Sequence, residues 1–100
     1  MAVRYRTGTQ GITVSVSVDD TSDPDNVVEK DFTGTSQHML HFRKPDGSIS
    51  TVSANVNDNR IEHVINDDLL DQRGMWSYWA TWMDGTYTDK TNDSVTFWVV

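Results

Sequence analysis

Apolar residues recur at every second position along much of the chain, which is the period of a half-buried β-strand. In the clearest stretch, Ile12, Val14, Val16 and Val18 alternate with polar residues. A second alternating stretch covers residues 37–44. The pattern therefore predicts strands whose two faces differ in polarity.

Turn-forming residues separate these stretches, at 45–48, 57–59 and 84–85. Only residues 66–73 favour a single turn of helix, because acids gather before two leucines. Short strands divided by turns predict an all-β protein, an immunoglobulin-like antiparallel β-sandwich of seven or eight short strands. We expect further strands at 27–32, 49–56, 60–65, 75–83, 86–88 and 94–100.

Residues 76–82 contain three of the four tryptophans, and their spacing of three would also suit a helix. Flanking glycines and the aromatic and β-branched content favour a strand instead. Its alternation predicts one core face, and a two-residue loop at 84–85 would place Trp82 opposite Tyr87. The residues predicted for the core are Trp76, Tyr78, Trp82, Leu40, Phe42, Val95 and Phe97.

Trp79 and Trp98 fall on the other face of their strands and are predicted to point outward on the same sheet. Three interpretations remain open for them. A loop or the N-terminal segment covers them, or they form a protein interface, where tryptophan is enriched, or they stack against a sugar. The neighbouring serine, threonine and methionine residues favour the interface over the sugar.

The N-terminal residues Arg4, Tyr5 and Arg6 place two cations and an aromatic ring on an otherwise acidic chain. Residues 1–8 are therefore either an extended docking arm, with these three residues at the interface, or an ordinary first strand. The length of 100 residues predicts one domain, spanning residues 1–100.

Charge and composition narrow the classes of partner. The chain has 15 acidic and 8 basic residues, a formal net charge of −7, which disfavours nucleic acid and anionic membranes. It has no cysteine, which excludes disulfides and thiolate metal sites. The start of the chain resembles neither a signal peptide nor a membrane span, so we expect a soluble protein made in the cytoplasm.

No combination of residues indicates catalysis, and we expect a protein that is not an enzyme and needs no cofactor. His38 and His41 are three residues apart on a predicted strand and so point to opposite faces. The only weak metal candidate is a calcium site at Asp19, Asp20, Asp23 and Asp25, which lacks the spacing of an EF-hand loop.

Two segments, LHFRKPDGSISTV (40–52) and LLDQRGMWSYWATWMDGTYTD (69–89), resemble the immunoglobulin-like modules of tailed-phage virions. The resemblance is to the N-terminal domain of upper baseplate proteins, in which a strand ends in a Phe-Arg-Lys-Pro-Asp-Gly turn. A Gly-x-Trp or Gly-x-Tyr sequence then begins an aromatic strand that ends in Asp-Gly. Here Gly74 and Trp76 match the start of that strand, and Asp46-Gly47 and Asp84-Gly85 match the two turns.

The resemblance implies a structural or accessory protein of a tailed-phage virion. Its partners would be other virion structural proteins of the baseplate, tail, neck or capsid surface, contacted in many copies on a symmetric assembly. Such modules normally precede a linker and receptor-binding regions, whereas this sequence ends at Val100. We therefore expect an accessory piece. A carbohydrate-binding β-sandwich with exposed tryptophans is the alternative.

Overall fold

The computed structural model describes residues 4–20, 25–66, 69–91 and 94–100. These residues form eleven strands and no helix, which confirms the predicted all-β class. The strands outnumber the expected seven or eight because several have only two or three residues. They are β1 (Arg4–Tyr5), β2 (Thr13–Ser17), β3 (Asp19–Asp20), β4 (Val28–Glu29), β5 (Thr35–Arg43), β6 (Ile49–Ser53), β7 (Asn55–Asn57), β8 (Arg60–Val64), β9 (Gly74–Asp84), β10 (Tyr87–Lys90) and β11 (Val95–Val99).

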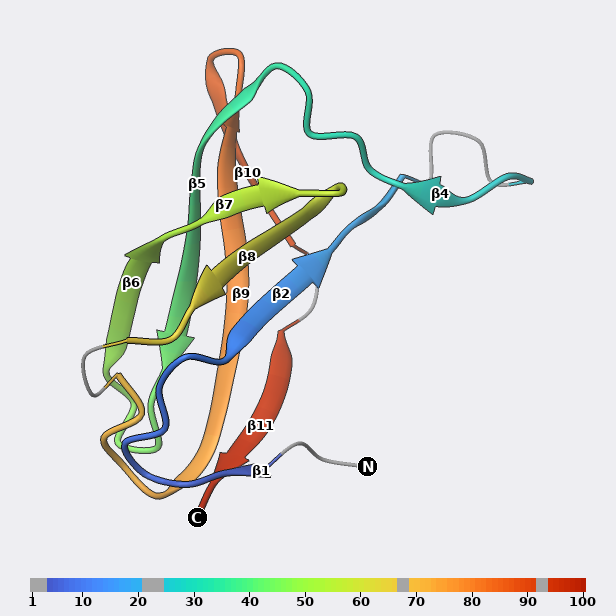
Figure 1. The fold of residues 1–100 in the computed structure, drawn as a ribbon. Coiled ribbons are helices and arrows are strands. Elements are labelled where there is room, and N and C mark those ends of the chain that lie inside the picture. The colour runs from blue at the N-terminus through green and yellow to red at the C-terminus, as the bar shows by residue number, and fades with distance from the viewer. Residues whose placement is uncertain (1–3, 21–24, 67–68, 92–93) are drawn as a thin grey trace.

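The strands build two facing sheets in a sandwich-like arrangement (Figure 1). The larger sheet has the order β1-β11-β9-β5-β6, with β10 also pairing with β9, and the smaller has the order β2-β8-β7. β3 and β4 pair only with each other, beside the sandwich. One pair, β1 with β11, is parallel, so the sheet is not purely antiparallel as predicted.

The core lies between the two sheets and takes alternate residues from each. Of the residues expected there, Trp76, Tyr78, Trp82, Leu40, Phe42 and Phe97 are buried. Val95 is the exception, because 38% of its surface is exposed. It begins β11 opposite Tyr78, and β1 pairs with Trp98 and Val99 at the other end of that strand, so among the described residues no strand lies beside Val95 on the side away from β9.

The aromatic core residues differ in how their polar atoms are satisfied. The Tyr78 hydroxyl donates to the Ser15 carbonyl oxygen (3.0 Å) and so joins β9 of the larger sheet to β2 of the smaller. Trp76 Nε1 donates to the Gln72 carbonyl oxygen at 3.0 Å. Trp82 Nε1 is buried and has no hydrogen-bond partner among the residues that the structure describes. Trp76 is therefore fixed by both packing and a hydrogen bond, and Trp82 by packing alone.

The turn between β9 and β10 has the predicted length but lies one residue later in the chain than predicted. Asp84 pairs with Tyr87, so the loop consists of residues 85 and 86 rather than 84 and 85. Gly85 occupies the first loop position with a φ of 62°, which type II′ hairpin turns require. Trp82 consequently lies opposite Asp89, and the predicted pair of Trp82 with Tyr87 does not form.

Two further predictions were wrong in detail. Residues 67 and 68 of the expected helical turn at 66–73 lie outside the described residues. The rest of that segment is not helical, although the Leu69 amide donates to the Asn66 carbonyl oxygen (3.2 Å), and the Leu70 carbonyl oxygen accepts from the Gly8 amide (2.8 Å). The expected strand at 49–56 divides at Ala54 into β6 and β7, which belong to different sheets. The Ala54 amide donates to the His38 carbonyl oxygen at this crossing.

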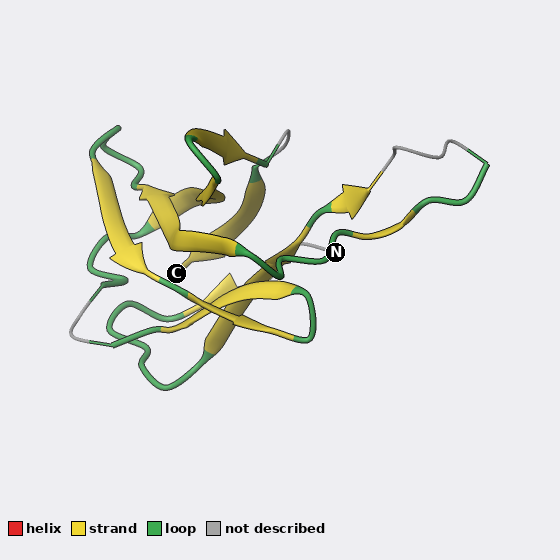
Figure 2. Cartoon of the chain, turned by 90° about the horizontal axis from the view of Figure 1, so that it is seen from above, coloured by secondary structure: helices red, strands yellow, loops and turns green. Residues whose placement is uncertain are grey.

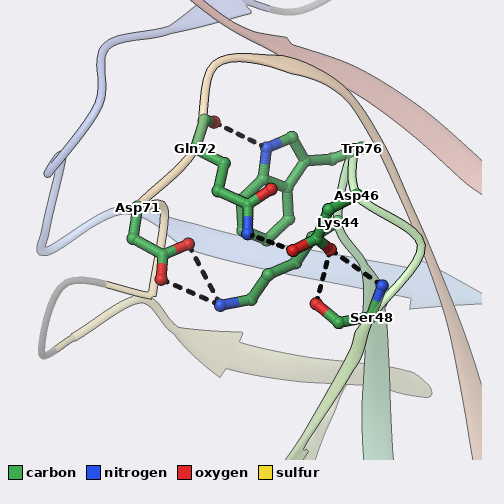
Figure 3. A network of polar contacts seen from close by, with 6 residues as sticks. All are labelled: Lys44, Asp46, Ser48, Asp71, Gln72 and Trp76. Carbon is green, nitrogen blue, oxygen red and sulfur yellow. Dashed lines mark hydrogen bonds and ion pairs between the residues drawn. The ribbon is translucent and has the colours of Figure 1, made fainter.

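A polar network joins the β5–β6 turn to the segment before β9 (Figure 3). One oxygen of Asp46 accepts from the Ser48 hydroxyl (2.6 Å) and amide (2.8 Å), and its other oxygen accepts from Gln72 (2.9 Å). These bonds, those from Ser48 foremost, lower the pKa of Asp46 to about 2. Lys44 binds both oxygens of Asp71 at 3.0 Å. The network therefore holds the backbone that positions Trp76.

Gly74 begins β9 directly beside this turn. Its φ of 132° lies in the region that side chains disfavour, and a Cβ atom there would lie 2.8 Å from Cγ of Pro45. Only glycine fits both the conformation and the contact. Pro45 and Gly74 therefore fix where the aromatic strand begins.

Candidate docking surface

The outer face of the larger sheet carries the side chains of β9 that point away from the core. Strand register places the neighbouring residues of β1, β5, β6, β10 and β11 on the same face. We call this surface the outer face. Its central members are Arg4, His41, Arg43, Thr51, Met75, Ser77, Trp79, Thr81, Lys90 and Trp98.

Trp79 lies in the middle of the outer face and is half-buried by side chains of β5. The imidazole of His41 stacks on its indole, with centroids 5.4 Å apart and an angle of 19° between the planes. The Arg43 guanidinium lies 5.5 Å from the centroid of the same indole. Its cover thus includes two neighbouring side chains of the same sheet, an arrangement that none of the sequence interpretations anticipated.

His41 is held in place through both ring nitrogens. Nδ1 lies 2.8 Å from the Thr51 hydroxyl, and Nε2 lies 2.8 Å from the Thr81 hydroxyl. A neutral imidazole donates through one nitrogen and accepts through the other, and hydroxyls suit either role. Partial burial lowers the pKa of His41 below its ordinary 6.5. The ring that covers Trp79 is therefore neutral at pH 7.

Trp98 is the more accessible of the two outward tryptophans, with 43% of its surface exposed. It pairs with Met75 of β9, which is 55% exposed, and with Arg4 of β1. Trp79 lies four residues further along β9, about 13 Å away along the strand. The two tryptophans therefore share a face but form separate patches.

The N-terminal residues divide between core and surface. Tyr5 packs its ring edge-on against Phe97, 5.7 Å between centroids, and its carbonyl oxygen accepts from the Val100 amide (2.8 Å). Arg4 and Arg6 are exposed. Residues 4 and 5 therefore form a strand of the larger sheet, and Tyr5 faces the protein's own core. Residues 1–3 of the predicted docking arm lie outside the described residues.

The outer face also has an unusual charge for this chain. Its strand residues include the cations Arg4, Arg43 and Lys90 and no aspartate or glutamate, although the chain as a whole carries a net charge of −7. The sequence placed His41 and Arg43 opposite the core-facing Leu40 and Phe42. Alternation alone could not show that His41 and Arg43 lie beside Trp79. That contact depends on the pairing of β5 with β9, which brings together His41 and Trp79, 38 positions apart in the sequence.

The candidate calcium ligands form no compact site in the described part of the chain. Asp19 and Asp20 lie in β3, and Asp25 precedes β4. Asp23 lies outside the described residues. Among the described residues, no three histidine or carboxylate side chains gather closely enough to hold a metal ion. The structure thus offers no geometric support for that candidate.

Comparisons with protein-family models, with curated proteins and with solved structures gave no match. The similarity to phage modules therefore rests on the two sequence segments alone and stays a prediction. Within the described residues, no helix is long and apolar enough to cross a membrane.

Proposed function

We propose that this chain is a non-enzymatic docking domain of a tailed-phage particle, built as an immunoglobulin-like sandwich that binds other virion proteins through its outer face. The observation that carries this proposal is the exposure of Met75 and Trp98 side by side on a cationic sheet face of an acidic protein. Exposed aromatic and methionine side chains are typical of protein interfaces.

A second observation supports the module resemblance. The two segments that carry it contact each other, because Pro45 packs against Gly74 and Gln72 donates to Asp46. The Lys-Pro-Asp-Gly turn and the Gly-x-Trp start of the aromatic strand therefore form one structural unit. A shared unit of this kind gives a physical reason for the two motifs to occur together.

The carbohydrate-binding alternative needs an indole face that is free to stack on a sugar ring. His41 and Arg43 already contact the indole of Trp79, so Trp98 is the better platform of the two. Sugar binding predicts a change in tryptophan fluorescence when polysaccharide is added, and loss of that change in Trp98→Ala. The docking proposal predicts no response to polysaccharide.

The test is incorporation into phage particles assembled in the producing host. The chain should co-purify with particles, and Met75→Ser and Trp98→Ser should each reduce its amount per particle at least tenfold. The matched control is Val56→Ser, which removes a 39% exposed apolar side chain from β7 of the smaller sheet. Absence of the wild-type chain from particles, or equal incorporation of all variants, would overturn the proposal.

A further inference from the structure

Strand β6 forms one edge of the larger sheet, and both views show it at the flank of the sandwich (Figures 1 and 2). Among the described residues, no strand pairs with β6 on the side away from β5. Its sequence, Ile-Ser-Thr-Val-Ser, contains no charged residue and no proline. Exposed edge strands usually carry charges, prolines or bulges that prevent pairing with another chain. The sequence of β6 therefore lacks the residues that normally keep an edge strand unpaired.

The backbone of β6 alternates in direction between β5 and the open edge. The Lys44 amide donates to the Ser48 carbonyl oxygen (2.9 Å), and the Ala54 amide donates to the His38 carbonyl oxygen (3.0 Å). Because bonded positions alternate along an antiparallel pair, the even-numbered residues direct their backbone groups toward β5. The odd-numbered residues of β6 direct theirs toward the open edge.

The odd-numbered residues are Ile49, Thr51 and Ser53, and all three are exposed. The Ser53 carbonyl oxygen does turn away from β5, since it accepts from Nδ1 of His63 (2.9 Å) and keeps a second lone pair. The amides and carbonyls of Ile49 and Thr51 have no hydrogen-bond partner among the described residues. A strand laid along this edge would therefore find a full set of donors and acceptors.

The other strand edges differ from β6. Strand β2, the five-residue edge of the smaller sheet, is also uncharged, but its Ser15 carbonyl oxygen accepts from the Tyr78 hydroxyl of the facing sheet (3.0 Å). Strand β10 contains Asp89 and Lys90, and β7 has only three residues. Within the described part of the chain, β6 is the five-residue edge strand that combines an uncharged sequence with unpaired backbone groups.

A second copy of β6 meets the requirements of this edge. In an antiparallel pair with a two-fold axis at Thr51, each Ile49 lies opposite Ser53 of the other copy, and Thr51 lies opposite its own counterpart. This register pairs the outward backbone groups of both strands. Two chains with a net charge of −7 meet here without opposed like charges, because β6 has none. Threonine opposite threonine is also a favourable cross-strand pair.

We propose that two copies of this chain pair through β6 and join their larger sheets into one continuous sheet. The contact is isologous, because the same strand serves on both copies. Strand β5 lies between β6 and β9, and β11 lies beyond β9. At the usual strand spacing, Met75 on β9 and Trp98 on β11 are about 10 Å and about 14 Å across the sheet from the contact, so both stay accessible.

The dimer adds a property that the proposed function does not include. A two-fold axis perpendicular to the sheet keeps both outer faces on the same side. One dimer would then present two docking surfaces to the same assembly, and two linked contacts bind more tightly than either alone.

The test uses the position of Thr51 on the two-fold axis. Thr51→Lys and Thr51→Glu each place like charges opposite each other, so each should weaken self-association at least about tenfold relative to wild type. Mixing the two variants places lysine opposite glutamate and should restore a one-to-one dimer. Sedimentation of the purified chains, from micromolar to millimolar concentration, measures the mass of each species.

Two sets of controls separate the contact from other effects of the substitutions. Thr51→Val removes the hydroxyl that bonds to His41 (2.8 Å) without adding a charge, so it should associate as wild type does. Thr13→Lys and Thr13→Glu make the same charge changes at an exposed threonine of β2 and should also associate as wild type does. Circular dichroism of every variant checks that the fold is kept.

A wild type that stays monomeric at millimolar concentration would overturn the dimer. Full association of Thr51→Lys or Thr51→Glu alone, or a mixture of the two that stays monomeric, would also overturn it. Incorporation into particles depends on Met75 and Trp98 and is measured separately, so the proposed function would survive failure of the dimer.

Discussion

The imidazole of His41 and the indole of Trp79 form a stacked pair on the outer face, 5.4 Å between centroids. The two residues lie directly opposite each other on β5 and β9. The stack partly shields a tryptophan that points away from the core. It also links the charge state of the outer face to the titration of one histidine.

His41 should titrate below its ordinary pKa of 6.5, because burial disfavours the charged ring. Its folded pKa is below its unfolded pKa, so the unfolded chain takes up the proton first. The associated stability is therefore present above pH 6.5 and is lost as pH falls through the folded pKa. Proton NMR of the His41 ring measures that pKa, and Trp79→Ala should raise it by exposing the ring. A midpoint at or above 6.5 in wild type would contradict the described burial.

Trp76 and Trp82 are both buried, and replacing either by alanine should cost about 3 to 5 kcal/mol of unfolding free energy. Replacement by phenylalanine should give different losses of stability at the two positions. Trp76→Phe loses the bond to the Gln72 carbonyl, whereas Trp82→Phe removes an indole nitrogen that bonds to none of the described residues. Urea denaturation should show Trp76→Phe to be less stable than Trp82→Phe by about 1 kcal/mol. Equal losses would mean that the hydrogen bond of Trp76 contributes nothing.

Gly74→Ala should destabilise the fold more than Gly47→Ala, although both glycines have positive φ. At Gly47 a Cβ atom meets nothing within 4 Å, so we expect about 1 kcal/mol from the backbone alone. At Gly74 the Pro45 ring adds a collision, and the loss should reach about 3 kcal/mol. Combining Gly74→Ala with Pro45→Ala should recover only part of the collision, because the contact with Cγ of Pro45 is lost while Cβ of residue 45 stays 2.9 Å from the new methyl group. Thermal melting of the four variants, including Pro45→Ala alone, measures this, and equal losses at both glycines would contradict the contact.

Asp46 should make the fold sensitive to acid. Hydrogen bonds lower its pKa to about 2 from the ordinary 3.8, so the unfolded chain binds this proton more readily. The contribution is present above about pH 4 and is lost as pH falls toward 2. Urea midpoints measured between pH 5 and pH 2 should fall for wild type and fall less steeply for Asp46→Asn. Parallel curves would show that Asp46 is not bonded as described.

Period-two alternation predicted most of the local structure. It placed β2, β5 and the long aromatic strand β9, and it separated the core tryptophans from Trp79 and Trp98. These features follow from sequence because the exposure of a side chain in a strand depends on its parity. The turn predicted at 57–59 is found at 58–59, where Asp58 and Asn59 both adopt positive φ, while Asn57 belongs to β7 and pairs with Arg60.

The remaining features depend on contacts between distant segments. Leu70 became part of a loop because its carbonyl binds Gly8, and no local pattern encodes that partner. The stack of His41 on Trp79 needs the register of β5 against β9. The short parallel pairing of β1 with β11 depends on Tyr5 packing on Phe97, across most of the chain. Pairing of this kind depends on the assembled core. The sequence alone therefore could not decide whether the N-terminal segment is a docking arm or a first strand.

The central claim is that the outer face is the surface through which the chain docks. Oxidative footprinting of side chains in the free chain and in assembled particles tests it most directly. Met75 and Trp98 should lose most of their reactivity on assembly, whereas Tyr87, which is 58% exposed in the free chain at the β9–β10 turn, should keep its reactivity. Unchanged reactivity of Met75 and Trp98 in particles that contain the chain would contradict the claim.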